Sequence, residues 1–135
     1  MNTVAQEHAL IEEICSGIPD VVAIYLFGSA SAGELRMGSD IDLAILPVTT
    51  LSTTRLWSLA QSLAVLAGRD VDLVDLQSAS TVMRAQVISK GKRLYCANAQ
   101  LCGEFEDRAY ADYARLNEER HDILDDISAR GRIYG

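Results

Sequence analysis

The stretch that decides the fold reads Val21-Val-Ala-Ile-Tyr-Leu-Phe27, then Gly28-Ser29 and, after ten further residues, Asp40-Ile-Asp-Leu-Ala-Ile-Leu46. Both apolar runs have the length of buried strands, and a Gly-Ser turn follows the first. Residues i and i+2 of a strand point to one face, so Asp40 and Asp42 are expected about 6.5–7 Å apart. Two bare carboxylates about 6 Å apart repel by roughly 2–3 kcal/mol at an effective dielectric constant near 20. The pattern therefore predicts a cation such as Mg2+ beside them.

The Gly28-Ser29 turn predicts the other half of the site. Glycine lets the backbone approach a ligand closely and tolerates positive φ. If Ser29 begins a short helix over residues 30–34, free N–H groups and the positive helix end face the space above the turn, which suits phosphate. Phosphate on one side and paired carboxylates on the other indicate a bound metal–nucleotide complex.

The spacing Gly28-Ser29, ten residues, Asp40-x-Asp42 resembles the signature of the polymerase-β-like nucleotidyltransferase superfamily. The short length and the tail look like its minimal nucleotidyltransferase branch, whose members act as antitoxins beside HEPN-type ribonuclease toxins. The resemblance covers about residues 10–97 and implies an α+β fold, a small mixed β-sheet with helices and with the site at one end. The plainer interpretation is an ordinary βαβ turn with solvated aspartates.

The resemblance also implies a reaction and its participants. AMP would pass from ATP to a tyrosine hydroxyl of a cognate HEPN-type toxin, releasing pyrophosphate and neutralising the toxin. Gly28 and Ser29 would hold the β- and γ-phosphates, and Asp40 and Asp42 would hold Mg2+. A third carboxylate from a neighbouring strand would ligate a second Mg2+ and help remove the hydroxyl proton, since two metals suit an in-line displacement.

Three aspartates around the expected strand 71–76 are candidates for that third carboxylate. Asp70 and Asp72 share one face, whereas Asp75 takes the other. Asp72 matches the family position best, because an apolar residue precedes it and Leu-Val follows. Asp75 is interpreted as a surface charge near the strand end.

The sequence departs from the family pattern at one place. Many relatives carry arginine just before the glycine that matches Gly33, but here that position is Ala32. Arg36 is the nearest replacement for a contact with the triphosphate. The details of nucleotide binding are therefore expected to differ from the usual pattern.

Composition bounds the remaining possibilities. The net charge is −7 and no basic stripe is visible, which argues against direct nucleic-acid binding. There is no apolar run of membrane-spanning length and no signal-peptide pattern, so no membrane association is expected. Three cysteines without metal-ligand spacing indicate reduced thiols in a cytoplasmic protein. Hydrophobic periodicity predicts helices over residues 3–17, 53–67 and 80–90, and an edge strand over residues 93–96.

The C-terminal part has a different pattern. Apolar residues spaced by three and four between residues 101 and about 130 predict one long amphipathic helix, and residues 131–135 a tail. Such a helix spans roughly 40 Å and should overhang a core whose radius of gyration is near 13 Å. We therefore divide the chain into a nucleotidyltransferase domain, 1–97, and a helical arm with a tail, 98–135. The alternative is a helix packed along its own core. The expected partner-binding residues are Tyr113, Leu116, Arg120, Ile123, Ile127 and Tyr134.

Two other function classes fit the sequence. A non-enzymatic antitoxin would block its toxin sterically, but it would have no need of the Gly-Ser turn and three aspartates. A small-molecule nucleotidyltransferase, for example one that modifies an aminoglycoside, would usually carry an extra substrate domain, which has no counterpart here.

Overall fold

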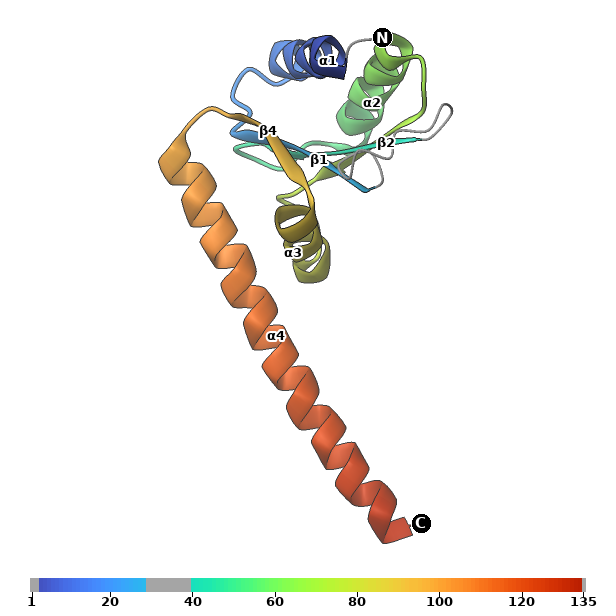
Figure 1. The fold of residues 1–135 in the computed structure, drawn as a ribbon, viewed down its shortest axis with the longest axis vertical. Helices are drawn as coiled ribbons and strands as arrows, with labels where there is room; N and C mark the ends of the chain where they lie inside the picture. Colours follow the sequence, from blue (N-terminus) through green and yellow to red (C-terminus); the bar gives the residue numbers. More distant parts are fainter. Residues whose placement is uncertain (1–2, 29–39, 135) are drawn as a thin grey trace.

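The computed structural model describes residues 3–28 and 40–134, and only the backbone of residue 3 and of residues 124–134. Four helices and four strands make up this part of the chain (Figure 1). In chain order they are α1 Thr3–Gly17, β1 Ala23–Phe27, β2 Ile41–Leu46, α2 Thr53–Ala67, β3 Val71–Asp75, α3 Thr81–Lys90, β4 Lys92–Cys96 and α4 Ala99–Tyr134.

The strands form one mixed sheet in the order β3-β2-β1-β4. β1 pairs antiparallel with both β2 and β4, while β2 and β3 are parallel and α2 connects them. β4 lies at an edge, as expected from the sequence. The predicted fold class, an α+β protein with a small mixed sheet and a long C-terminal helix, is confirmed.

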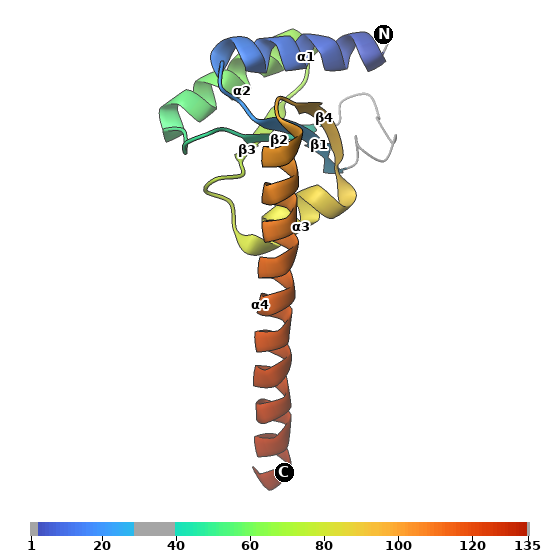
Figure 2. The ribbon, with the colours of Figure 1, turned by 90° about the vertical axis from the view of Figure 1, so that its left-hand side faces the viewer.

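The helices cover the sheet on both faces (Figure 2). α1 and α2 pack on one face over Ile24, Leu43 and Ile45. α3 and the first turns of α4 cover the other face, where Tyr25 and Ala44 lie. Alternation along the strands divides the core in this way, because successive strand side chains point to opposite faces.

Local signals fix the ends of α2 and α3. Ser52 and Ser80 are N-caps whose hydroxyls accept hydrogen bonds from the backbone N–H groups of Arg55 and Met83, each at 3.1 Å. Gly68 ends α2 with φ at 69°, a left-handed conformation that glycine adopts without strain. These signals explain why the predicted bounds of α2 agree with the structure.

The long helix α4 differs from the prediction at both ends. It begins at Ala99 because the Asn98 side chain accepts a hydrogen bond from the Leu101 N–H at 3.1 Å. It continues through residues 131–134, which we predicted to be a tail, since one glycine costs a helix only about 1 kcal/mol. Most of α4 extends well beyond the core, as the prediction of an overhanging helix requires (Figure 1). Among the residues described, no helix combines the length and apolar character needed to cross a membrane.

The root of α4, which we define as residues 99–109, is fixed to the sheet. Cys102 and Ala109 are buried there. The Tyr25 hydroxyl donates a hydrogen bond to Glu106 Oε1 at 2.9 Å, and Arg93 forms an ion pair with the same oxygen at 3.3 Å. Burial, and then the hydrogen bond to Glu106, raise the pKa of Tyr25, so the phenol stays protonated as a donor. The direction in which the arm leaves the core is therefore set by specific contacts.

Candidate functional site

The candidate site lies where β1 ends and β2 and β3 begin. In the sheet register Phe27 lies opposite Asp42, and Asp42 lies opposite Asp72 on the parallel neighbour β3. Neighbouring strands are about 4.8 Å apart, and residues in register point to the same face. Asp42 and Asp72 therefore stand side by side on the face that α3 covers, with Asp40 just before β2.

Gly28 follows β1 directly and lies against Asp42. Its φ of 74° is in the left-handed region, which side chains rarely adopt. A Cβ added at this position would overlap Asp42 Oδ2 and lie 3.2 Å from the carboxylate carbon. Glycine is needed here both for its conformation and for space, because any side chain would displace the carboxylate.

The electrostatics of the cluster follow from this crowding. The pKa of Asp42 is raised above its usual value of 3.8, first by burial and then by the negative charges of Asp72 and Asp40. Within the part of the chain that the structure describes, no lysine or arginine forms an ion pair with any of the three. The three aspartates form an acidic cluster that the described protein groups do not neutralise.

Asp75 has a different environment. It is buried, with 3% of its surface exposed, so our interpretation of it as a surface charge was wrong. Its two oxygens accept hydrogen bonds from the backbone N–H groups of Leu51 and Gln77, each at 2.9 Å. It lies on the α2 face of the sheet and joins the loop before α2 to the end of β3. The hydrogen bond from the N–H of Gln77, two residues on, is an Asx turn, which an aspartate at a strand end could have indicated; the contact with Leu51 has no such local signal.

The donor set suits a hard cation. Mg2+ takes one or two protein carboxylates and completes its shell with substrate phosphates and water. Over residues 3–28 and 40–134 no three acidic, histidine or cysteine side chains converge as a metal site by themselves. Asp42 and Asp72 supply the usual number of carboxylates, and the acidic cluster lacks a counter-charge among the described residues. The residues present therefore fit a metal that arrives with a nucleotide.

Several predicted residues cannot be placed. Ser29 and Arg36, together with the predicted short helix 30–34, lie outside the described residues. The side chains of Ile127 and Tyr134 in α4 are likewise not described. The predicted roles of these residues stay predictions.

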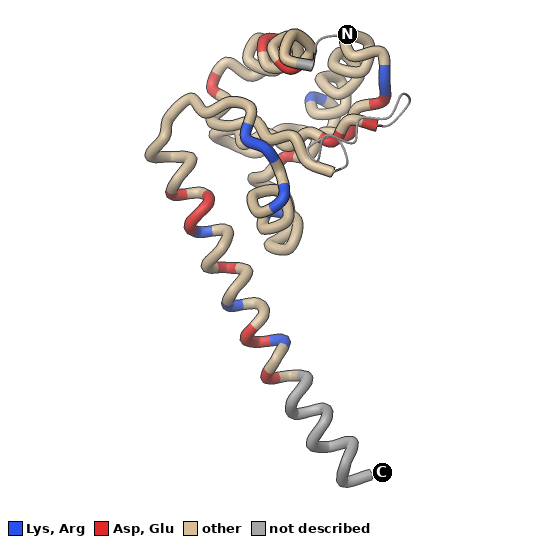
Figure 3. The backbone as a smooth tube through the Cα atoms, viewed as in Figure 1, with Lys and Arg blue, Asp and Glu red and all other residues tan. Residues whose placement is uncertain are grey.

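The described partner-binding candidates lie along the projecting part of α4. Tyr113 and Leu116 are half-buried, whereas Arg120 is exposed and Ile123 is 58% exposed. Acidic and basic positions alternate along the same stretch (Figure 3). The arm is thus a charged helix that also carries apolar side chains, some of them far from any core.

Comparisons with known proteins identify the family. The polymerase beta nucleotidyltransferase family matches residues 10–100, the segment that holds the sheet and the acidic cluster. This chain belongs to that family of nucleotidyltransferases.

Individual relatives narrow the class. The chain is 43% identical over 123 residues to the protein adenylyltransferase MntA of Shewanella oneidensis, covering 91% of this chain and 88% of the relative. A crystal structure of a toxin–antitoxin with AMP-PNP matches with a TM-score of 0.82 and 43% identity, covering 90% of this chain and 97% of that one. A structure of a tri-AMPylated Shewanella oneidensis HEPN toxin in complex with MNT antitoxin matches with a TM-score of 0.77 and 41% identity, covering 91% and 96%.

Proposed function

We propose that this protein is an antitoxin that transfers AMP from ATP to a tyrosine hydroxyl of a cognate HEPN-type toxin and so neutralises it. The observation that carries the proposal is the register of Asp42 with Asp72 beside Gly28. The relatives support it, since one is a protein adenylyltransferase and the others include an ATP analogue and an AMPylated toxin. These likenesses extend over nine tenths of the chain, well beyond the sheet.

The cluster gives each residue a role in this reaction. The tyrosine oxygen attacks the α-phosphorus of ATP, the bond to the bridging oxygen breaks, and pyrophosphate leaves on the opposite side. Asp72 accepts the hydroxyl proton, because its carboxylate is exposed and an incoming tyrosine hydroxyl can reach it. Gly28 brings the backbone of the turn close to the phosphates, and Ser29 and Arg36 complete the phosphate contacts.

Asp40 and Asp42 would hold one Mg2+, and Asp72 would ligate a second ion. When bound, Mg2+ offsets the negative charge of the carboxylates and of the triphosphate. The raised pKa of Asp42 supports this assignment, because a carboxylate crowded by like charges and burial gains most from a cation.

The test is transfer to the partner. The protein is incubated with the HEPN-type toxin, MgATP or ATP with a chelator, and the toxin is weighed by mass spectrometry. We expect mass increases of whole AMP units with MgATP only, and none when the acceptor tyrosine of the toxin is changed to phenylalanine. Inhibition of the toxin without any change in mass would instead show a steric antitoxin. Transfer to an aminoglycoside but not to the toxin would show a small-molecule enzyme.

We further propose that the arm beyond the root of α4 docks the toxin. Tyr113, Leu116 and Ile123 follow the three- and four-residue spacing of a helix that binds in a groove. Ile123 keeps more than half of its surface exposed, so covering it in a groove of the toxin would stabilise the complex. Aromatic and arginine residues usually dominate such surfaces, so Tyr113, Arg120 and Tyr134 are the expected anchors. The proposed division assigns catalysis to residues 1–97 and docking to residues 98–135. The root of α4 belongs to the second part but packs on the core.

Ile123→Glu in the full chain tests the arm, with Ala114→Glu on the opposite side of the helix as the matched control. Both residues are exposed and both variants add one charge. We expect Ile123→Glu to weaken toxin binding at least tenfold and Ala114→Glu to leave it within twofold. Equal losses in both variants would mean that charge, not the apolar face, governs docking.

A further inference from the structure

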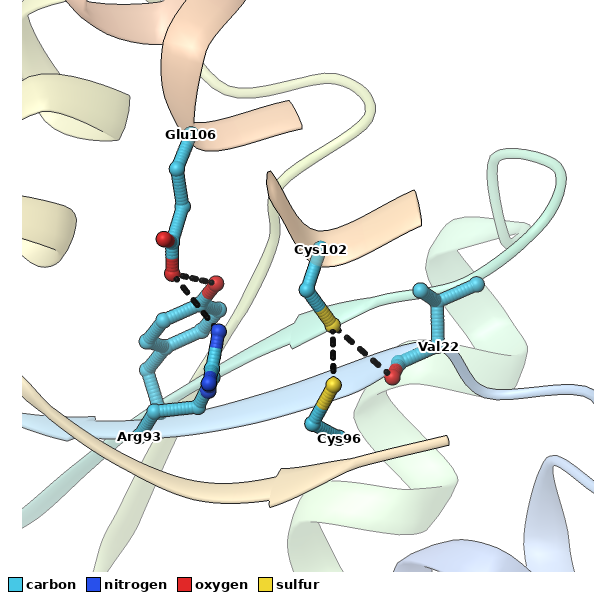
Figure 4. Close-up of polar contacts among 6 residues, drawn as sticks. Val22, Arg93, Cys96, Cys102 and Glu106 are labelled. Atoms are coloured by element: carbon cyan, nitrogen blue, oxygen red, sulfur yellow. Dashed lines mark hydrogen bonds and ion pairs between the residues drawn. The ribbon is translucent and has the colours of Figure 1, made fainter. Parts of the chain in front are cut away.

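Two cysteine thiols meet where β4 joins α4. Cys96 is the last residue of β4, and Cys102 lies in the root of α4. Their sulfur atoms are 2.8 Å apart, against about 2.05 Å for a disulfide bond (Figure 4). Both cysteines are free thiols. A small movement of either side chain would bring the sulfurs to bonding distance.

The two thiols differ in access. Cys102 is fully buried, and its sulfur also lies 3.6 Å from the Val22 carbonyl oxygen. Burial, and then the contact with Cys96, raise the pKa of Cys102 to about 11, so it is a poor nucleophile by itself. Cys96 is half-buried and is the thiol that a small oxidant reaches first.

The third cysteine cannot compete for this pairing. Cys15 packs against the core cluster under α1 and α2, whereas Cys96 and Cys102 belong to the cluster on the opposite face of the sheet. The described polar partner of Cys15 is Tyr95, on the α1 face of β4. Among the described contacts none joins Cys15 to Cys96 or Cys102. Oxidation should therefore consume two thiols and leave the third.

We propose that Cys96 and Cys102 are an oxidisable pair that forms an intramolecular disulfide when the protein meets hydrogen peroxide. The Cys96 sulfur attacks one peroxide oxygen, the O–O bond breaks, and Cys96 becomes a sulfenic acid while the first water leaves. The Cys102 sulfur then attacks the Cys96 sulfur, loses its proton and releases the second water. The two thiols give up two electrons and two protons, and the peroxide is reduced to two waters.

The bond would fasten the root of the arm to the sheet. Glu106 lies one turn after Cys102 and already contacts Arg93, so the disulfide would add a covalent link to an existing polar joint (Figure 4). Closing a short loop restricts the unfolded chain, which stabilises the folded state. We expect the melting temperature to rise on the order of 5–10 °C. A thiol reductant should reverse the rise.

Alkylation after oxidation tests the pairing. The full-length protein is treated with hydrogen peroxide, unfolded, alkylated and digested with trypsin, which releases residues 94–108 as one peptide with both cysteines. We expect this peptide to lose two hydrogen atoms and take up no alkyl group, while Cys15 is alkylated. Alkylation of both cysteines, a sulfinic acid at Cys96, or a disulfide between two chains would each overturn the proposal.

Single variants provide the controls. Cys15→Ser should keep both the peptide result and the rise in melting temperature. Cys96→Ser should lose both, and its reduced form should melt close to the reduced wild type because Cys96 is only half-buried. An oxidation-dependent rise in Cys96→Ser would show that the stabilisation has another origin, and absence of a rise in Cys15→Ser would contradict the proposed link.

Discussion

Asp72 and Asp75 lie three residues apart on β3 and have opposite surroundings. Asp72 is exposed beside Asp42 and adds to a crowd of negative charge. Asp75 is buried, and two backbone N–H groups satisfy its carboxylate. A carboxylate whose hydrogen bonds are met by the protein contributes to stability, whereas one left beside like charges costs stability until a ligand arrives. The difference separates a structural aspartate from a functional one on the same strand.

The largest expected effect is on the rate of transfer, when each of the two carboxylates is replaced by an amide in turn. Asp72→Asn is expected to lower transfer to the toxin by about 1,000-fold, because roughly 4 kcal/mol of transition-state stabilisation would be lost with the proton acceptor and metal ligand. Asp75→Asn should transfer at a rate within a few fold of the wild type per folded molecule. Single-turnover assays at saturating MgATP measure both. If Asp75→Asn loses transfer and Asp72→Asn keeps it, the choice of Asp72 as the catalytic aspartate of β3 is wrong.

A second test uses the nucleotide as a probe of the acidic cluster. Ligand that binds only the folded protein adds about 2.7 kcal/mol to the free energy of unfolding at a hundred times Kd. We expect MgATP to raise the melting temperature of the wild type and of Asp75→Asn alike. The double variant Asp40→Asn/Asp42→Asn should stay folded and lose the rise. An equal rise in the double variant would place the nucleotide elsewhere.

The third expected effect is on the stability of the protein when the buried Asp75 is changed. Asp75→Asn keeps one acceptor oxygen and leaves either Leu51 or Gln77 without a partner for its N–H. The expected loss is about 1–3 kcal/mol in the free energy of unfolding. Urea unfolding without nucleotide measures it. Asp72→Asn is the matched control, and it should lose nothing or become slightly more stable, because it removes one of the like charges beside Asp42.

These contrasts also show how far the sequence could lead. The strand 41–46 and the helix 53–67 were predicted with the bounds they have, because periodicity, the Ser52 cap and the Gly68 stop all act locally. The same local logic predicted Asp40 and Asp42 on one face; Asp40 lies just before β2, and its charge, after burial and the charge of Asp72, helps to raise the pKa of Asp42. The neighbour of Asp42 on β3 depends on the parallel register, so only the family resemblance singled out Asp72.

The features that could not be predicted from the sequence depend on contacts between segments that are distant in the chain. The burial of Asp75 requires the loop before α2 to return over β3, and nothing near Asp75 in the chain shows that return. The hydrogen bond between Tyr25 and Glu106 links residues that are 81 positions apart in the chain. The contact between Cys96 and Cys102 depends on the turn between β4 and α4, and the spacing of the two cysteines alone does not predict it.

The smallest expected effect is on the pH dependence of stability, and it concerns Asp42. Its pKa is raised in the folded protein, first by burial and then by Asp72 and Asp40. A carboxyl group with a raised folded-state pKa binds more protons in the folded than in the unfolded state. The resulting stabilisation is full below the unfolded value near 3.8 and is lost as the pH rises through the raised value.

Without nucleotide and Mg2+, the wild type should therefore lose stability relative to Asp42→Asn as the pH rises above about 4. The difference should be modest, because Asp42 is only half-buried and water screens part of the repulsion. Urea unfolding of both proteins at a series of pH values measures it. With MgATP the order should reverse near neutral pH, since the ionised carboxylate then has a cation and the variant does not. A wild-type-minus-variant difference that stays constant with pH would mean that the crowding of Asp42 has no energetic consequence, and the main physical reason for placing a metal at this carboxylate would be lost.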